Sequence, residues 1–135
     1  MSIVKIRIAL ETALNAMTPE LATSWENVAY APTTGVPYQA VSLLAAPPDN
    51  PTMGGAFHRE LGYLQVTLNY PLQSGPAAVA TRAELIRSAF PRGASFSSGG
   101  VTTIIDATPE IGRGQVDGDR WAVPVKIRWH ADVFS

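Results

Sequence analysis

Two stretches of the chain alternate apolar and polar residues with a period of two. Between residues 63 and 70 every second side chain is apolar, and between residues 121 and 130 apolar side chains occupy the odd positions from Trp121 to Trp129. This alternation is typical of strands that bury one face of a sheet, so both tryptophans are expected in the core. Pro124 interrupts the second stretch and predicts a sheet edge or a bulge, because proline cannot donate a ladder hydrogen bond.

Two longer stretches repeat their apolar residues at helical spacing. Residues 3–17 follow Ser2, a favourable N-cap, and precede Pro19, which disfavours helical geometry in the residue before it. The start of this stretch also alternates like a strand, but its length favours a helix. A second helix is predicted over residues 76–90, with Pro76 in its first turn.

The apolar faces of these helices and strands define the predicted core. On the second helix, Arg82, Glu84 and Arg87 lie off the apolar stripe. Both helices are expected on one face of the sheet, because each stripe must be buried against another element. The core prediction comprises Ile6, Leu10, Leu14, Val66, Leu68, Val79, Ile86, Phe90, Val125 and Ile127.

Shorter apolar runs predict further strands at residues 25–30, 38–44, 94–97 and 101–105. Hairpin-like pairs outnumber crossover units in the resulting order of elements. We therefore expect an α+β fold, in which two principal α-helices pack on a mainly antiparallel or mixed β-sheet. The length of 135 residues predicts a single domain over residues 1–135.

Residues 45–59 form the longest predicted loop, because prolines and glycines interrupt regular structure there. Loops of about 15 residues in compact domains are usually functional or disordered, and we expect this one to be mobile in the free subunit. Met53, Phe57 and Arg59 are candidates for a subunit contact, although the two apolar side chains could equally pack on their own domain. Residues 112–119 are rich in Gly and Asp and predict a hairpin loop.

The composition favours an assembling protein over a binder of polyanions. Charged residues make up 16% of the chain, which is below the roughly one quarter of typical domains. A surface poor in charge is compatible with buried subunit contacts. The net charge of −1 disfavours nucleic-acid binding, and we expect no specific nucleic acid as a partner.

Several chemistries lack the residues they need. There is no cysteine, so disulfides, thiolate metal sites and a cysteine nucleophile are excluded. Charged residues interrupt the apolar stretch at the N-terminus, and no run is long enough for a membrane span. We therefore expect a soluble protein made in the cytoplasm, with no membrane partner.

No cofactor, catalytic or metal site is predicted. The glycines of residues 112–118 lack dinucleotide-binding spacing and precede a strand, and residues 93–97 lack the second glycine of a nucleophile elbow. His58 and His130 lie in a predicted loop and on a strand, and His130 is expected to face solvent.

Four basic side chains could gather near the last hairpin and contact DNA or an acidic partner. A solvated strand face, with nearby aspartates neutralising it, is the favoured interpretation. The four side chains are Arg113, Arg120, Lys126 and Arg128.

An ordered series of short segments resembles the tail terminator-like proteins of long-tailed phages. The similarity spans nearly the whole chain, and its combination of segments is more specific than any one of them. The segments are residues 6–10, Trp25-Glu26-Asn27, Tyr30-Ala31-Pro32, residues 38–44, residues 62–66, Tyr70-Pro71 with Gly75, residues 89–93, residues 117–121 and residues 123–125.

This resemblance implies an α+β structural protein without enzyme activity. It implies a homo-oligomeric, hexameric ring that caps the tail tube, stops its polymerisation and presents the surface that joins the head. The expected partners are further copies of the chain, the tail tube protein and a head-completion or connector protein. The expected location is the tail of a phage or prophage virion, assembled in the cytoplasm of the bacterial host, and the isolated chain could be a monomer.

Three other functions remain open from the sequence. The first is another head–tail connector or minor tail component of similar build. The second is a small ligand-binding or hydrolase domain, which a deep pocket lined by Asp106, Arg128 and His130 would favour. The third is a DNA-binding accessory protein, which the near-neutral charge disfavours.

Overall fold

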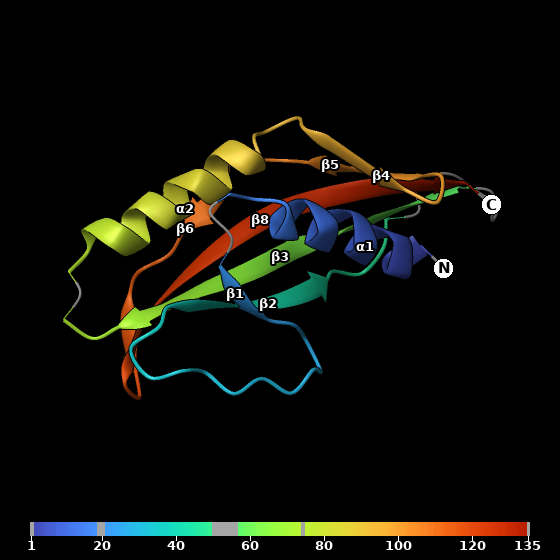
Figure 1. Ribbon diagram of the computed structural model, residues 1–135. Helices are drawn as coiled ribbons and strands as arrows, with labels where there is room; N and C mark the ends of the chain where they lie inside the picture. Colours follow the sequence, from blue (N-terminus) through green and yellow to red (C-terminus); the bar gives the residue numbers. More distant parts are fainter. Residues whose placement is uncertain (1, 19–20, 50–56, 74, 135) are drawn as a thin grey trace.

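The computed structural model describes residues 2–18, 21–49, 57–73 and 75–134. Two helices and eight strands follow one another in these segments (Figure 1). In chain order they are α1 (Ser2–Asn15), β1 (Ala22–Ser24), β2 (Tyr38–Ala45), β3 (Phe57–Pro71), α2 (Ala77–Ala89), β4 (Ser95–Ser98), β5 (Val101–Ile105), β6 (Glu110–Ile111), β7 (Gln115–Asp117) and β8 (Arg120–Phe134).

The strands form one curled sheet around a central antiparallel pair. The main path is β1-β2-β3-β8-β5-β4, and β6 and β7 also pair with β8. Only β1 and β2 run parallel; the other pairs in the described part of the chain are antiparallel. Strands β3 and β8 have 15 residues each and pair from Phe57 with Phe134 to Pro71 with Arg120. The predicted α+β class is confirmed.

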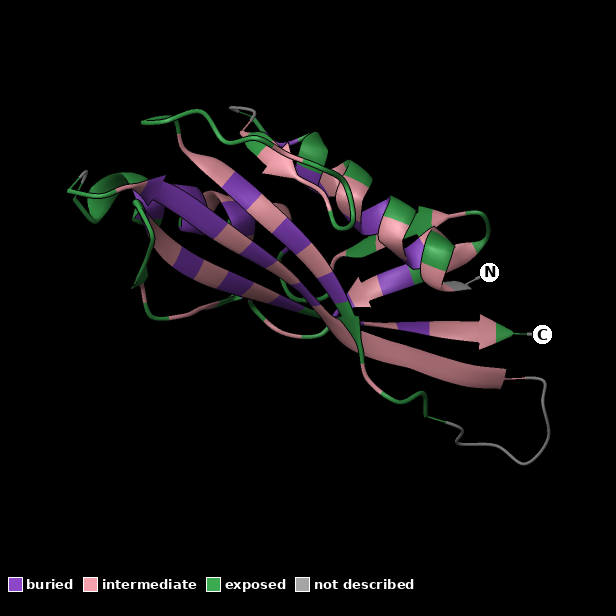
Figure 2. Ribbon diagram, turned by 90° about the horizontal axis from the view of Figure 1, so that it is seen from below, coloured by how far each residue is buried: buried purple, intermediate pink, exposed green. Residues whose placement is uncertain are grey.

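Both helices cover the same face of this sheet (Figure 1), and the core lies between the two layers. The buried positions form alternating bands along the long strands (Figure 2). The bands of β3 and β8 coincide because Val66 pairs with Val125 and Leu64 with Ile127. All ten side chains of the predicted core are at most 4% exposed, which confirms the assignment of faces.

Two side chains depart from the predicted core pattern. Arg82 is only 4% exposed, because the three- and four-residue spacing from Val79 and Ile86 places it on the buried face of α2. Burial lowers the pKa of its guanidinium, which interacts electrostatically with Tyr70. Trp129 is fully buried as expected, whereas Trp121 is only half-buried near the start of β8.

The strand predicted at residues 25–30 is wrong. The strand in this region is β1, which pairs in parallel with the first residues of β2. The chain then turns, and Asn27 adopts a positive φ of 59°, a conformation that asparagine tolerates better than most residues. Trp25 packs against the core instead of joining the sheet.

The loop predicted at residues 45–59 extends too far at its C-terminal end. Strand β3 begins at Phe57, because residues 57–59 pair with residues 132–134 of β8. Arg59 and Asp49 also exchange two backbone hydrogen bonds, of 2.8 and 2.9 Å. Met53 lies outside the described residues, and the mobility of the loop stays a prediction.

The loop predicted at residues 112–119 contains a short strand. Strand β7 pairs with the start of β8, and the chain turns at Gly118, whose φ is positive. Between the pairs Ile111 with Val125 and Gln115 with Ala122, three residues of one strand face two of the other. This bulge accommodates Pro124 inside a central strand, and it is one of the two features, a sheet edge or a bulge, that the proline predicted.

Candidate assembly surfaces

The first candidate surface is the end of the long strand pair where β3 begins and β8 ends, which we name the arm end (residues 45–49, 57–61 and 130–134). The rings of Phe57 and Phe134 lie 5.0 Å apart between centroids. Phe134 is 76% exposed, whereas Phe57 is half-buried. An aromatic pair at a strand end offers a large apolar contact to another molecule.

Charged side chains surround this aromatic pair. The Arg59 guanidinium donates two hydrogen bonds to the carboxylate of Asp132, from Nε at 2.7 Å and from Nη2 at 3.3 Å. These bonds hold the pKa of Asp132 below its usual value. On the opposite face of the strands, His58 Nε2 lies 3.0 Å from Glu60 Oε1. The arm end therefore combines an exposed aromatic centre with a polar rim, as protein interfaces do.

The structure brings together two of the three side chains predicted for a subunit contact. Phe57 and Arg59 both face the side of β3 that the helices leave uncovered, since they alternate with the residues of the buried face. Met53 falls outside the described residues, so its place in this surface stays untested.

The second candidate surface is an apolar hollow at the other end of the strand pair, which we name the Trp121 pocket. Its volume is about 250 Å³. It is lined by Pro71, Leu72, Gln73, Gly75, Pro76 and Trp121. Leu72 is 41% exposed and adds an apolar side chain to the rim of the pocket.

Gly114 lies directly against the indole of Trp121. A Cβ atom on this residue would lie 2.3 Å from Cζ2 and 2.6 Å from Nε1 of Trp121. Only glycine fits so close to the ring, so Gly114 allows the Trp121 indole to take the position in which it lines the pocket. The sequence patterns did not predict this pocket. An apolar Leu72 among turn residues was the available signal.

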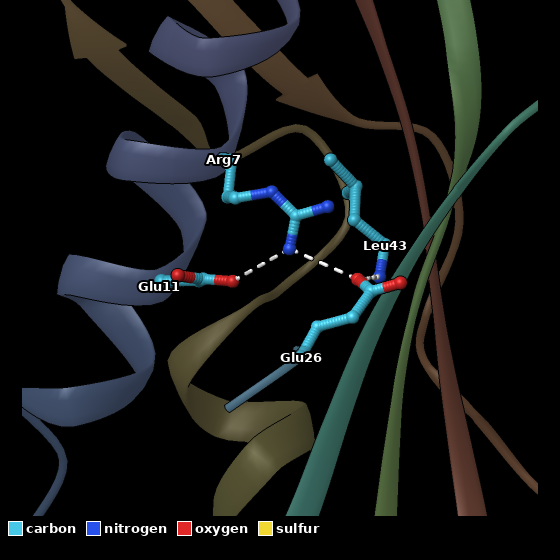
Figure 3. Close-up of polar contacts among 4 residues, drawn as sticks. All are labelled: Arg7, Glu11, Glu26 and Leu43. Carbon is cyan, nitrogen blue, oxygen red and sulfur yellow. Dashed lines mark hydrogen bonds and ion pairs between the residues drawn. The ribbon is translucent and has the colours of Figure 1, made fainter. Parts of the chain in front are cut away.

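A polar cluster joins α1 to the sheet (Figure 3). Glu26 Oε1 accepts a hydrogen bond from the backbone N–H of Leu43 at 3.0 Å and another from Arg7 Nη1 at 2.9 Å. Arg7 also donates to Glu11 Oε2 at 3.1 Å. The backbone hydrogen bond from Leu43 is the main reason that the pKa of Glu26 is lowered, with Arg7 adding to the effect. Glu26 thus satisfies an N–H of β2 beyond the last residue of β1.

A hydrolase pocket would need Asp106, Arg128 and His130 to line one cavity. These residues instead lie where the chain after β5 meets β8 and contact one another there. His130 is not freely exposed as expected, since its Nδ1 contacts the carboxylate of Asp106. Arg128 meets these residues through its backbone carbonyl, which accepts from the Asp106 N–H at 2.9 Å, while its side chain is exposed. In the described part of the chain, no three His, Asp or Glu side chains are placed to hold a metal ion.

The four basic side chains near the last hairpin do not act as one patch. Arg120 is 5% exposed and donates to the carbonyls of Thr33 and Val36, below the ring of Tyr38. Lys126 lies over the ring of Tyr63, 5.2 Å from its centroid. The predicted solvated strand face therefore does not include Arg120, which is buried in contacts within its own subunit.

Residues 5–129 match the profile of a family described as phage tail terminator protein. The chain belongs to the phage tail terminator protein family. One solved structure superposes on this tail terminator with a TM-score of 0.74 and 21% sequence identity, covering 100% of this chain and 99% of the other. That likeness shows a shared fold. No curated protein gives a significant match.

Family membership agrees with the resemblance found in the sequence. It places this tail terminator among structural proteins of phage tails and implies contact with the tail tube. None of the helices among the described residues is long and apolar enough to span a membrane.

Proposed function

We propose that this tail terminator forms a closed ring on the end of the tail tube, ends polymerisation of the tube and presents the surface that joins the head. The family match over residues 5–129 carries this proposal. The proposed partners are further copies of the chain, the tail tube protein and a head-completion protein. The protein acts by assembly in the virion tail, without catalysis.

The arm end supports the proposal as one of the two patches that a ring needs. Cyclic closure requires a head-to-tail contact in which different patches of one subunit meet. Phe134 exposes 76% of its surface beside Phe57, and Arg59 borders the pair. Phe57 and Arg59, together with the untested Met53, are our proposed contact residues.

The deciding experiment is tail assembly in a phage that lacks this protein. Over-long tails, whether or not they join heads, support the proposal, and the wild-type gene should restore normal tails. Tails of normal length that still join heads overturn it. Tails of normal length that fail to join heads favour the alternative of a connector or another minor tail component.

A charge reversal at Arg59 tests the contact more narrowly. We expect Arg59→Asp to weaken ring formation and leave the melting of the monomer almost unchanged, because exposed ion pairs contribute little stability. The exchanged pair Arg59→Asp with Asp132→Arg is the control. If the exchange restores rings, Arg59 acts only within its own subunit; if rings stay weak, it contacts a neighbour.

A further inference from the structure

The two ends of the β3–β8 pair carry unlike apolar features. Phe57 and Phe134 stand at one end, and the Trp121 pocket lies at the other, beside Pro71. Phe57 and Pro71 are the first and last residues of β3, so about 45 Å of strand separates the two features. They cannot meet within one subunit. Features at opposite ends can meet between successive copies.

The size of the pocket suits an aromatic ring. A cavity of about 150 Å³ lined by apolar side chains accommodates benzene. The Trp121 pocket has a volume of about 250 Å³ and is open to solvent along one side. Phe134 is the most exposed large apolar side chain among the described residues.

The two ends also carry opposite charge. The arm end holds three carboxylates and one guanidinium, from Asp49, Glu60 and Asp132 against Arg59, and residues 50–56 add no charged side chain. The pocket end, residues 70–82 and 113–121, holds three guanidiniums and two carboxylates, from Arg82, Arg113 and Arg120 against Asp117 and Asp119. Arg82 and Arg120 are buried, at 4% and 5% exposure, so the positive sign of this end acts through the long-range field and not through side chains that a second copy touches. This field orients an encounter of one copy with the next.

We infer that Phe134 of one subunit, with Phe57 beside it, packs into the Trp121 pocket of the next copy and forms the head-to-tail contact of the ring. The inference rests on the proposed ring and names its second patch. A phenylalanine buries at most about 250 Å², well short of the roughly 800 Å² per partner of a stable interface. The contact is therefore an anchor within a weak interface, which the tail tube strengthens by holding the subunits side by side.

Engineered cysteines test this contact directly, because the chain contains no native cysteine. The test variant carries Ala77→Cys, an exposed position next to Pro76 of the pocket lining, and Val133→Cys, a half-buried position next to Phe134, so Phe134 and Leu72 stay in place. The matched control carries Ile8→Cys and Val133→Cys, since Ile8 is 50% exposed on α1, away from the pocket. Each variant is treated with a short bis-maleimide, both alone at high concentration and on tail tubes from the phage lacking this protein.

The expected result is a ladder of covalent multimers for the Ala77→Cys/Val133→Cys variant and no ladder for the control. An equal mixture of the two single-cysteine variants should give only covalent dimers, because each chain carries one thiol and can be cross-linked only once. In addition, Phe134→Ala should weaken self-association at least tenfold.

The outcomes separate this inference from the proposed function. If tails lacking the protein are defective but the test variant gives no ladder on the tubes, the Phe134 contact is wrong and the ring proposal stands. If the ladder forms but tails without the protein are normal, the contact stands and the terminating function is wrong. A ladder of equal strength from the control overturns the contact.

Discussion

Removing the carboxylate of Glu26 should weaken the attachment of the segment after β1 to the sheet. This carboxylate is the acceptor for the Leu43 N–H and for Arg7, at 3.0 and 2.9 Å (Figure 3). In Glu26→Ala the N–H of Leu43 loses its partner on a partly buried strand. The change also removes the link between α1 and this segment, so both effects act in the same direction.

The magnitude follows from the exposure of the two partners. A hydrogen bond to a charged group contributes about 1.5–3 kcal/mol when buried. The Glu26 side chain is 41% exposed, and water replaces part of the lost bond, so we expect a loss of about 1–2 kcal/mol for Glu26→Ala. Arg7→Ala should cost about 0.5–1 kcal/mol, because it removes exposed ion pairs and leaves the Leu43 bond. Glu26→Gln keeps an acceptor and should fall between them.

Urea unfolding of the three variants measures these differences, provided that the slope with denaturant is unchanged. The dependence on pH gives a second check. Since the folded-state pKa of Glu26 lies below 4.5, the unfolded chain takes up the proton first as the pH falls. The stabilisation is therefore present above pH 4.5 and is lost on further acidification, so the deficit of Glu26→Ala should shrink there. A loss for Arg7→Ala as large as that for Glu26→Ala would refute the role assigned to the Leu43 bond.

Three further predictions concern packing. Phe90→Ala should destabilise the fold by about 3–5 kcal/mol in the same assay, because Phe90 is fully buried, whereas Ile8→Ala on the exposed face of α1 should change stability by less than about 0.5 kcal/mol. Gly62→Ala should cost about 2 kcal/mol or more, because its Cβ would lie 2.2 Å from a backbone carbonyl of β2; normal amide protection in β2 would contradict this. Gly114→Ala should displace the indole of Trp121, shift its fluorescence and reduce ring formation with little loss of secondary structure; an unchanged spectrum would count against the close contact.

Local periodicity was enough to assign the buried faces of the long elements. Residues 63–70 and the apolar residues of α1 alternate or repeat over enough positions that only one face can be apolar. The assignment of Leu10 and Phe90 to the core needed no knowledge of what covers them. The burial of Arg82 was not predicted, because the buried stripe of α2 was defined by apolar residues alone. Its spacing from Val79 nevertheless places it on the buried face.

Contacts between distant parts of the chain set where strands begin and which side chains share a surface. Residues 57–59 follow a stretch rich in proline and glycine, which predicted a loop there. They form a strand because β8, more than 70 residues later, supplies their hydrogen-bond partners. Phe57 and Phe134 become one aromatic pair, and Pro71 and Trp121 become neighbours, through this same pairing. Periodicity reports which face of an element is apolar, because that property is local. Pairing between distant strands depends on the free energy of the whole sheet, so it leaves no comparable pattern in either segment.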